Sequence, residues 1–245
     1  MHGLLRPWRK VTRPVFVGIE HVPDERPLLF VGNHTLFGVI DVPLMFFELW
    51  RKRGIFLRAL GHHGHFKVPV WGDFLRRFGV IDGTRENCAA LMAAGEAVLV
   101  FPGGSREVAK RKGERYRLFW KDRLGFAKMA LRHRCTIVPF GAVGADDAYD
   151  IVVDGDDLLR TPVGKLGRKL GVLDEDFLPP IVRGHRGTPL PKPERLYFRF
   201  EPPIGTAEWD GRDDETAARA VRDRTRAAIE HALTELLALR ARHQR

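Results

Sequence analysis

One histidine stands where a catalytic base would be needed. Gly32-Asn33-His34-Thr35 directly follows the strand expected over Leu28–Val31, and Asp41 comes seven positions after His34. Ligands of α/β sheets bind at the carboxyl ends of strands, so His34 is in a position to meet a substrate. An imidazole titrates close to neutral pH, and a neighbouring carboxylate holds it in one tautomer. The pair predicts general-base chemistry, although a lone loop histidine is more often only a hydrogen-bonding residue.

The spacing between the two residues constrains the chain. If Thr35–Asp41 formed one straight helix, His34 and Asp41 would lie about 10 Å apart, because a helix rises about 1.5 Å per residue. We therefore expect the segment to loop back, and Gly38 is the residue that permits it. Asp41 is the only acidic residue between Asn33 and Phe47, which makes it the local candidate partner.

A second polar segment follows the strand expected over Ala97–Phe101. It reads Pro102-Gly103-Gly104-Ser105-Arg106-Glu107. Glycines at the end of a strand let backbone N–H groups approach an anion, and the fork of Arg106 binds phosphate through two hydrogen bonds. A plain strand-to-loop turn is the structural alternative. Ser105 lacks the strained Gly-x-Ser-x-Gly elbow of a nucleophile.

The pattern around these segments predicts an α/β domain, because short β-branched runs alternate with helical segments. The further strands expected are Ile55–Leu60, Val80-Ile81, Thr136–Phe140 and Arg195–Phe200. The helices expected are Val42–Arg53, Val70–Arg77, Thr84–Ala94 and Lys121–His133.

We expect one domain over residues 1–245. Its catalytic core covers about 28–144, an irregular Gly-, Pro- and Asp-rich insertion or lid covers about 146–193, and a C-terminal helix covers about 213–241. The helix carries acids in its first turn and basic residues at its end, which suits the helix dipole.

Four ordered motifs resemble those of the glycerolipid acyltransferase superfamily, which includes lysophosphatidate acyltransferases. Gly32-Asn33-His34…Asp41 is similar to its His/Asp motif, and Phe78–Arg85 to its acceptor-side motif. Phe101–Arg106 resembles its Phe-Pro-Glu-Gly-Thr-Arg motif, and Ile137–Phe140 its Val-Pro motif. The resemblance covers roughly 28–144. It is closer to the branch with Phe-Pro-Gly-Gly-x-Arg-Glu, which includes diacylglycerol acyltransferase-like and phytyl ester synthase-like enzymes.

The resemblance implies a central, mixed but largely parallel sheet flanked by helices. It implies an O-acyltransferase of lipid metabolism, including phospholipid biosynthesis, that moves a fatty acyl group from acyl-CoA or acyl carrier protein to a lipid hydroxyl. His34 and Asp41 are then the catalytic residues. Substrate binding is expected from seven residues: Asn33, Arg85, Gly103, Gly104, Ser105, Arg106 and Glu107. Direct transfer requires no metal and no cofactor.

Two departures from the family pattern leave the substrate open. Six residues separate His34 from Asp41, where four are usual, and Gly103 stands where the lysophosphatidate enzymes have Glu. The acceptor is therefore lysophosphatidate, diacylglycerol or a long-chain alcohol. A lipid hydrolase or a non-catalytic lipid-binding protein on the same fold are the alternative functions.

The charge of the chain bears on its partners. The formal net charge is +10, which attracts polyanions. Nucleic-acid motifs are absent, so we expect an anionic membrane surface rather than nucleic acid. No apolar stretch reaches the roughly 18 to 20 residues of a spanning helix. The candidate contacts are Leu4, Leu5, Trp8 and Val11, where Pro7 is expected to prevent a clean helix, or Phe46, Phe47, Leu49 and Trp50.

Three further groups of residues are candidate sites: the two cysteines, a histidine-rich segment and a basic run. Cys88 and Cys135 are expected to be free thiols in a reducing compartment, in keeping with a cytoplasmic protein held at the inner face of the membrane. His62, His63 and His65 fit no common zinc spacing and are expected to line the cleft. The basic run Lys110–Lys112 is either a solvated face or a site for coenzyme A or lipid phosphates.

Overall fold

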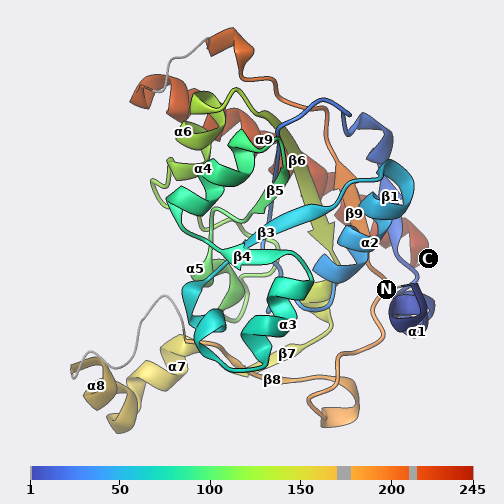
Figure 1. Cartoon of the computed structure of the whole chain (residues 1–245). Helices are drawn as coiled ribbons and strands as arrows, with labels where there is room; N and C mark the ends of the chain where they lie inside the picture. The colour runs from blue at the N-terminus through green and yellow to red at the C-terminus, as the bar shows by residue number, and fades with distance from the viewer. Residues whose placement is uncertain (1, 170–177, 210–213, 245) are drawn as a thin grey trace.

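The computed structural model describes residues 2–169, 178–209 and 214–244. The expected sheet is confirmed: seven strands run in the order β1-β9-β6-β2-β5-β3-β4 (Figure 1). All neighbours are parallel except β6 and β9, so the sheet is mixed and largely parallel. The strands are β1 (Val15–Val17), β2 (Leu28–Gly32), β3 (Leu57–Gly61), β4 (Val80–Asp82), β5 (Ala97–Val100), β6 (Thr136–Val143) and β9 (Tyr197–Phe200).

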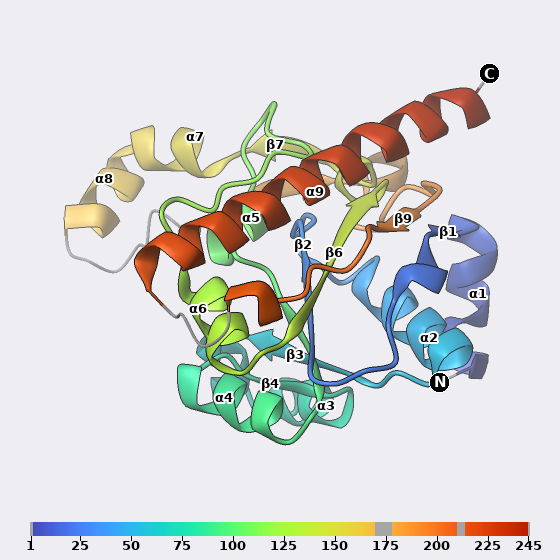
Figure 2. The ribbon, with the colours of Figure 1, turned by 90° about the horizontal axis from the view of Figure 1, so that it is seen from above.

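The central strand β2 is buried on both faces of the sheet. Leu28 and Phe30 belong to one apolar cluster, together with side chains of α2. Leu29 and Val31 belong to the other, together with side chains of α4, α6 and α9. Both clusters are needed because a parallel sheet is stable only when helices cover its two faces. Figure 2 shows α9 lying across β6 as one of these covering helices.

The helices expected from the sequence are present as α2, α3, α4, α6 and α9, and within the described residues four shorter or terminal helices join them. Together they are α1 (His2–Thr12), α2 (Val42–Arg53), α3 (Trp71–Arg77), α4 (Arg85–Ala93), α5 (Ser105–Val108), α6 (Gly125–Arg132), α7 (Gly155–Arg160), α8 (Pro162–Lys169) and α9 (Glu215–His243). Gly54 ends α2 with φ 63°, and the Thr84 hydroxyl caps α4 by accepting from the Asn87 N–H. The helix expected from Lys121 begins only at Gly125.

Two expectations fail. Pro7 lies inside α1, which is a continuous helix. Tertiary packing outweighs the lost backbone bond, because Leu5 and Trp8 pack on the core and the Trp8 indole donates to the Ile40 carbonyl at 2.9 Å.

The segment expected to be irregular, 146–193, also carries regular structure. It contains α7, α8 and a separate antiparallel pair formed by β7 (Asp150–Val153) and β8 (Ile181–Arg183). These elements are too short for a clear sequence period. Whether the segment acts as a lid remains a prediction, and 170–177 within it, like 213 of the expected C-terminal helix, lies outside the described residues.

Candidate active site

His34 follows β2, which ends at Gly32. Because β2 runs parallel to β6, His34 lies at the end of the sheet toward which β6 points in Figure 1. Its backbone is held on both sides. The His34 N–H donates to Glu107 Oε2 at 2.8 Å, and the Lys110 ammonium donates to the His34 carbonyl. The ring packs against Phe101, with 4.3 Å between ring centroids. Residues about 70 positions downstream therefore fix the place of this histidine.

The environment of the His34 ring determines its protonation. Nδ1 lies 2.8 Å from the Thr35 carbonyl oxygen. A carbonyl only accepts hydrogen bonds, so Nδ1 carries the proton and the lone pair resides on Nε2. Burial is the main cause that lowers the pKa of His34 to about 4, with the nearby Lys110 ammonium acting in the same direction. The neutral imidazole, which is the form that accepts a proton, therefore prevails at neutral pH.

Asp41 lies one residue before α2 and is buried. Its Oδ1 accepts from the Thr35 hydroxyl at 2.9 Å and from the Val42 N–H at 2.9 Å, so it caps the helix. Burial raises the pKa of Asp41 to about 6. The expected direct contact is not formed, since no hydrogen bond joins His34 to Asp41 among the described residues. Thr35 stands between them: its hydroxyl binds Asp41, and its carbonyl binds His34.

The predicted loop at Gly38 is confirmed. Gly38 has φ 64°, in the left-handed region that L side chains rarely adopt. A Cβ atom at this position would lie 2.5 Å from Cε1 of His34. Glycine is therefore required twice, for the turn of the chain and for the close approach of the imidazole.

Glu107 is a buried brace between two loops. One carboxylate oxygen accepts from the His34 N–H, and the other accepts from the Phe119 N–H at 2.8 Å. Burial raises the pKa of Glu107. We expected Glu107 to bind substrate, but its two oxygens are used to hold the backbone of the catalytic histidine and of the Phe119 loop.

Lys110 and Asp146 complete this brace, and sequence reasoning missed both. Lys110 is 2% exposed and lies 3.5 Å from Asp146 Oδ2, whereas the sequence placed it in a run that is exposed or binds phosphate. Asp146 Oδ1 accepts from the Leu36 N–H at 2.7 Å and Oδ2 from the Tyr116 N–H at 3.1 Å. The sequence showed Lys110 only as part of a basic run, and Asp146 only as an acid at the start of a Gly- and Asp-rich segment, so neither stood out.

The glycine turn after β5 accommodates the brace. A Cβ atom on Gly103 would lie 2.1 Å from the carboxyl carbon of Glu107, so only glycine fits beside this carboxylate. Gly104 has φ 52° and ψ −142°, a conformation reserved for glycine, and Ser105 begins α5 immediately after it. The shape of the turn thus depends on both glycines.

Arg106 is already paired within the chain. Its guanidinium binds both carboxylate oxygens of Glu114, at 2.9 and 2.5 Å, and it stacks on the Phe119 ring at 4.4 Å. The expected fork-like geometry is present, but an internal carboxylate occupies it. Phosphate binding by Arg106 remains a prediction, and it requires displacement of Glu114.

Two other expected substrate residues lie outside the immediate site. The Asn33 amide donates to the Ala142 carbonyl at 3.0 Å and accepts from the Ala142 N–H at 2.8 Å, so it joins β2 to β6. Arg85 is exposed in the first turn of α4, after β4 at the edge of the sheet. The order of strands puts β5 and β3 between β2 and β4, so Arg85 and His34 do not meet directly.

The histidine-rich segment borders the site without forming a metal centre. Within the described ranges, no group of three or more His, Cys, Asp or Glu side chains could hold a metal ion. The His62 ring accepts from the Gly64 N–H at 3.1 Å, and His65 Nδ1 lies 3.3 Å from the Trp71 indole nitrogen. His65 is close enough to His34 to lower its pKa electrostatically, so this segment lies beside the catalytic residue.

Comparison with known proteins places this geometry in a family. Residues 13–143, which contain β2, the His34 loop, the Gly103-Gly104 turn and β6, match the family described as Acyltransferase. The chain belongs to this family. No helix in the described part of the chain is long and apolar enough to cross a membrane.

Relatives refine the family. The chain is 32% identical to phytyl ester synthase 1 (chloroplastic) of Arabidopsis thaliana, over 90% of this chain and 34% of that protein. It is 34% identical to phytyl ester synthase 2 of the same plant, over 81% of this chain and 31% of that protein. A human protein named "DGAT1/2-independent enzyme synthesizing storage lipids" is 27% identical over 84% of the chain. The chain spans about a third of the length of the plant relatives.

A solved structure has the same fold. The 1-acyl-sn-glycerophosphate (LPA) acyltransferase PlsC of Thermotoga maritima matches with a TM-score of 0.57, over 96% of this chain and 80% of that one. The sequence identity is 15%, so the likeness concerns the fold alone. The glycerolipid acyltransferase resemblance and the architecture that it implied are thus both confirmed.

Proposed function

We propose that this acyltransferase moves a fatty acyl group from coenzyme A to the hydroxyl of a neutral lipid alcohol, with His34 as general base. One observation carries the proposal: Nδ1 is bound to the Thr35 carbonyl, which leaves the Nε2 lone pair on a ring that stays neutral at physiological pH. A neutral imidazole with a free lone pair is the form that can accept the proton of a hydroxyl.

In the proposed reaction, His34 first accepts a proton and then returns it. Nε2 of His34 takes the proton of the acceptor hydroxyl while its oxygen attacks the thioester carbonyl carbon. The tetrahedral intermediate collapses, the carbon–sulfur bond breaks, and the imidazolium returns the proton to the leaving thiolate. The products are an ester and a thiol. No metal and no redox cofactor takes part in this scheme.

Asp41 acts in this mechanism as a positioning residue. Its bond to the Thr35 hydroxyl fixes the peptide whose carbonyl holds His34 Nδ1. Because the carbonyl accepts the Nδ1 proton, the same arrangement fixes the tautomer, which in other enzymes a carboxylate does directly. The effect of Asp41 therefore reaches the reacting atoms through Thr35.

The negatively charged oxygen of the tetrahedral intermediate needs a hydrogen-bond donor, and we look for it in the glycine turn after β5. The Asn33 side chain is bound to Ala142, and the Gly104 N–H donates to the Phe101 carbonyl at 2.9 Å. Neither is free to bind a developing negative charge. The Gly103 N–H has no acceptor among the described residues, and it lies on the turn that packs against Glu107 beside His34. We assign it the role of oxyanion donor.

The internal ion pairs favour a neutral acceptor. Arg106 is bound to Glu114, and Lys110 is buried against Asp146 and the His34 carbonyl. Neither cation is free to bind the phosphate of lysophosphatidate without breaking these contacts. Diacylglycerol or a long-chain alcohol needs no such clamp, in keeping with the names of the plant and human relatives.

A basic pocket is suited to the donor. Arg111, next to Lys110 in the chain, lines a pocket of about 360 Å³ together with Arg160 and Lys165 of α7 and α8. Arg111 pairs with Asp156 at 2.6 Å, while Arg160 and Lys165 form no salt bridge among the described residues. A concave site lined by several cations suits the phosphates of coenzyme A, which supports this donor over a carrier protein.

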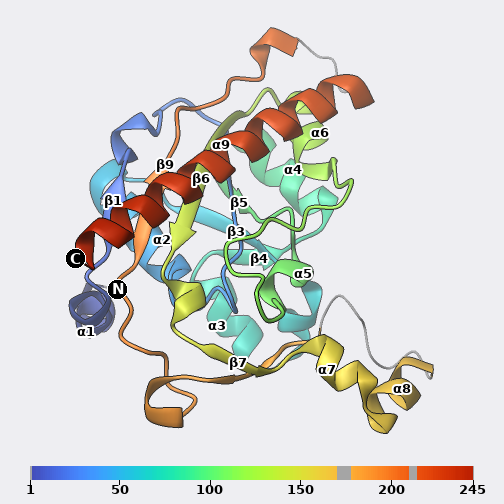
Figure 3. The ribbon, with the colours of Figure 1, turned by 180° about the vertical axis from the view of Figure 1, so that it is seen from behind.

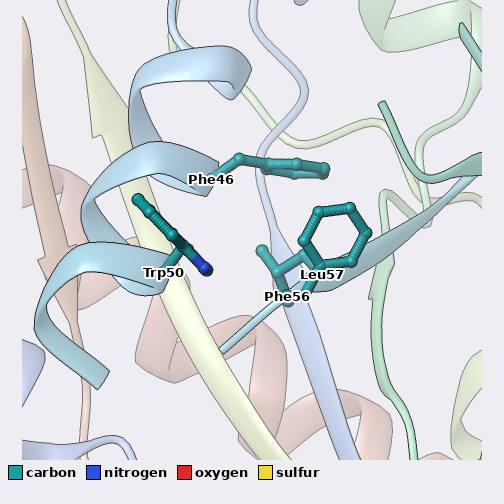
Figure 4. Close-up of a pocket in the computed structure, with 4 residues that line it drawn as sticks. All are labelled: Phe46, Trp50, Phe56 and Leu57. Carbon is teal, nitrogen blue, oxygen red and sulfur yellow. The ribbon is translucent and has the colours of Figure 1, made fainter. Parts of the chain in front are cut away.

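An apolar pocket is suited to the acyl chain. Phe46 and Trp50 of α2, with Phe56 and Leu57 at the start of β3, enclose about 250 Å³ (Figure 4). Phe46 and Trp50 lie on α2, which begins directly after Asp41, so one helix connects the site to this pocket. Replacing Trp50 with Ala is expected to shift acyl preference toward longer chains.

Such an enzyme works at a membrane, and we place it peripherally on the cytoplasmic face. The net charge of +10 supports an anionic surface as its partner.

The test is incubation of the purified chain with labelled palmitoyl-CoA and separate acceptors: lysophosphatidate, diacylglycerol and phytol. Ester formation with diacylglycerol or phytol supports the proposal. Ester formed only from lysophosphatidate contradicts the neutral acceptor, and release of free fatty acid alone indicates a hydrolase.

A further inference from the structure

Four apolar side chains are exposed together around the start of α3. Val70 is 81% exposed, Val68 52%, Phe74 46% and Trp71 37%. We call these four residues the α3 apolar surface. Scattered exposed apolar residues are common, but a contiguous group that includes two aromatic rings marks a contact site.

The backbone holds this surface in a strained conformation. Val70 has φ 67° and ψ −46°, and the Trp71 N–H donates to the Pro69 carbonyl at 2.7 Å, which makes a γ-turn of the rare, strained type. A β-branched residue is unfavourable at positive φ. The turn thus places an apolar side chain at its tip, where it is almost fully in water.

Packing behind the turn keeps the surface rigid. The Gly72 N–H donates to the Val68 carbonyl at 3.0 Å, and a Cβ atom on Gly72 would lie 3.1 Å from the backbone of Phe66. The Trp71 and Phe74 rings are stacked, with centroids 5.6 Å apart and planes 17° apart. The apolar side chains are thus presented as a preformed unit, with little conformational entropy left to lose on binding.

The surface lies beside the catalytic residue. The Trp71 indole is in contact with His65, and His65 influences the pKa of His34 electrostatically. In Figures 1 and 3, α3 lies at the same end of the molecule as α5, the end toward which β6 points. A partner that covers the α3 apolar surface would therefore lie beside His65 and near His34.

The charges around the surface indicate what that partner is. Lys67 and Arg77 are exposed and form no salt bridge in the described part of the chain, whereas Arg76 is paired with Asp73 at 2.9 Å. Aromatic side chains with flanking cations suit the boundary between headgroups and acyl chains of an anionic bilayer.

We propose that the α3 apolar surface docks the enzyme onto an anionic lipid bilayer, with Lys67 and Arg77 against the headgroups. This inference rests on the proposed function, because docking beside His34 brings a lipid acceptor to the base. Of the contacts expected from the sequence, Phe47 and Leu49 are buried and Trp8 donates to the Ile40 carbonyl, so these three are not available to a membrane. Val11 and Trp50 are 43% and 52% exposed, and a membrane contact of these two stays a prediction.

The test is vesicle co-sedimentation of the full chain and the double variant Val70→Gly, Phe74→Ser. Glycine suits the positive φ of position 70, so the fold is expected to persist, and the urea midpoint of the variant checks this. On vesicles of phosphatidylglycerol and phosphatidylcholine, we expect the variant to bind about tenfold more weakly or worse, since two apolar side chains no longer leave water. Binding of the unmodified chain should weaken as salt rises.

The matched control is Val163→Ser, Leu166→Ser on α8, where two apolar residues are 77% and 57% exposed among other basic residues. Loss of binding in the α8 variant with full binding in the α3 variant would overturn the assignment, as would equal binding of the unmodified chain to pure phosphatidylcholine.

Two further measurements separate docking from catalysis. The His34→Ala chain should bind vesicles normally, and the α3 variant should keep its turnover of a water-soluble short-chain alcohol. If the unmodified chain binds vesicles as expected but forms no ester with any acceptor, the proposed function is contradicted and the docking surface is not.

Discussion

Replacing Glu107 with Gln tests whether this residue holds the catalytic histidine in place. The side chain is fully buried, and its two oxygens accept from the His34 and Phe119 N–H groups, both at 2.8 Å. Gln has nearly the same shape, but it has one acceptor oxygen, and its NH₂ group would face one of the two donors. One charge-assisted bond is therefore lost, which is worth about 1.5–3 kcal/mol.

Part of that loss is offset. Burial raises the pKa of Glu107, so the charge itself is unfavourable in this place and its removal is a gain. We expect a net destabilisation of about 1–2 kcal/mol for Glu107→Gln. Glu107→Ala leaves both donors unsatisfied and creates a cavity, so about 3–5 kcal/mol is expected.

Urea unfolding measures the free energies, and steady-state kinetics measures the consequence for His34. We expect kcat of Glu107→Gln to fall about tenfold, because a histidine displaced by a fraction of an ångström meets the acceptor hydroxyl poorly. KM for acyl-CoA should stay unchanged. The control is Glu208→Gln, whose carboxylate is paired with Arg224 on the surface and should change stability by less than about 0.5 kcal/mol. Unchanged stability and kcat in Glu107→Gln would refute the bracing role.

Three further predictions concern the same site. Since the pKa of His34 is lowered to about 4, the acid limb of kcat/KM should lie clearly below pH 6.5, and a midpoint at or above 6.5 would contradict a buried neutral base. Asp41→Asn should be more stable than the unmodified chain at pH 7.5 but slower in turnover. The Asp41 pKa rises from 3.8 to about 6, so its contribution to stability is present below pH 3.8 and is lost as pH rises through 6. In urea unfolding at pH 7.5, the free energy of unfolding of Asp41→Asn should exceed that of the unmodified chain by up to about 3 kcal/mol, and this difference should disappear near pH 4. Gly103→Ala should lower both stability and kcat because its Cβ meets the Glu107 carboxyl, whereas Gly125→Ala, with open space around its Cβ, should be neutral.

The fold was largely predictable because its signals are local. β2 and β5 are apolar runs bounded by glycine and proline, and α2 ends at a glycine that adopts the left-handed conformation. Gly38 was predictable too, since a seven-residue spacing is incompatible with a straight helix between partners. In contrast, β7 and β8 have three or four residues each and gave no period.

The residues that hold the His34 loop from outside it were not predictable, because their contacts join positions far apart in the sequence. Asp146 binds the Leu36 N–H across 110 positions, and Lys110 binds the His34 carbonyl across 76. A lysine within a basic run has the composition of an exposed residue, and only the folded chain buries it. The pairing of Arg106 with Glu114 was missed for another reason. The glycine-rich turn indicated an external anion as the partner of Arg106, but the carboxylate of Glu114, eight residues away, accepts the same two hydrogen bonds from the guanidinium.

The proposed mechanism requires a neutral His34 to take the proton of the lipid hydroxyl while the acyl group is transferred. The most direct measurement is a single-turnover reaction of labelled palmitoyl-CoA with diacylglycerol or phytol, using the unmodified chain and His34→Ala, with labelled ester, free acid and thioester quantified together. We expect labelled ester from the unmodified chain and unreacted thioester from a folded His34→Ala chain. Ester formation at a near-normal rate by His34→Ala would contradict it.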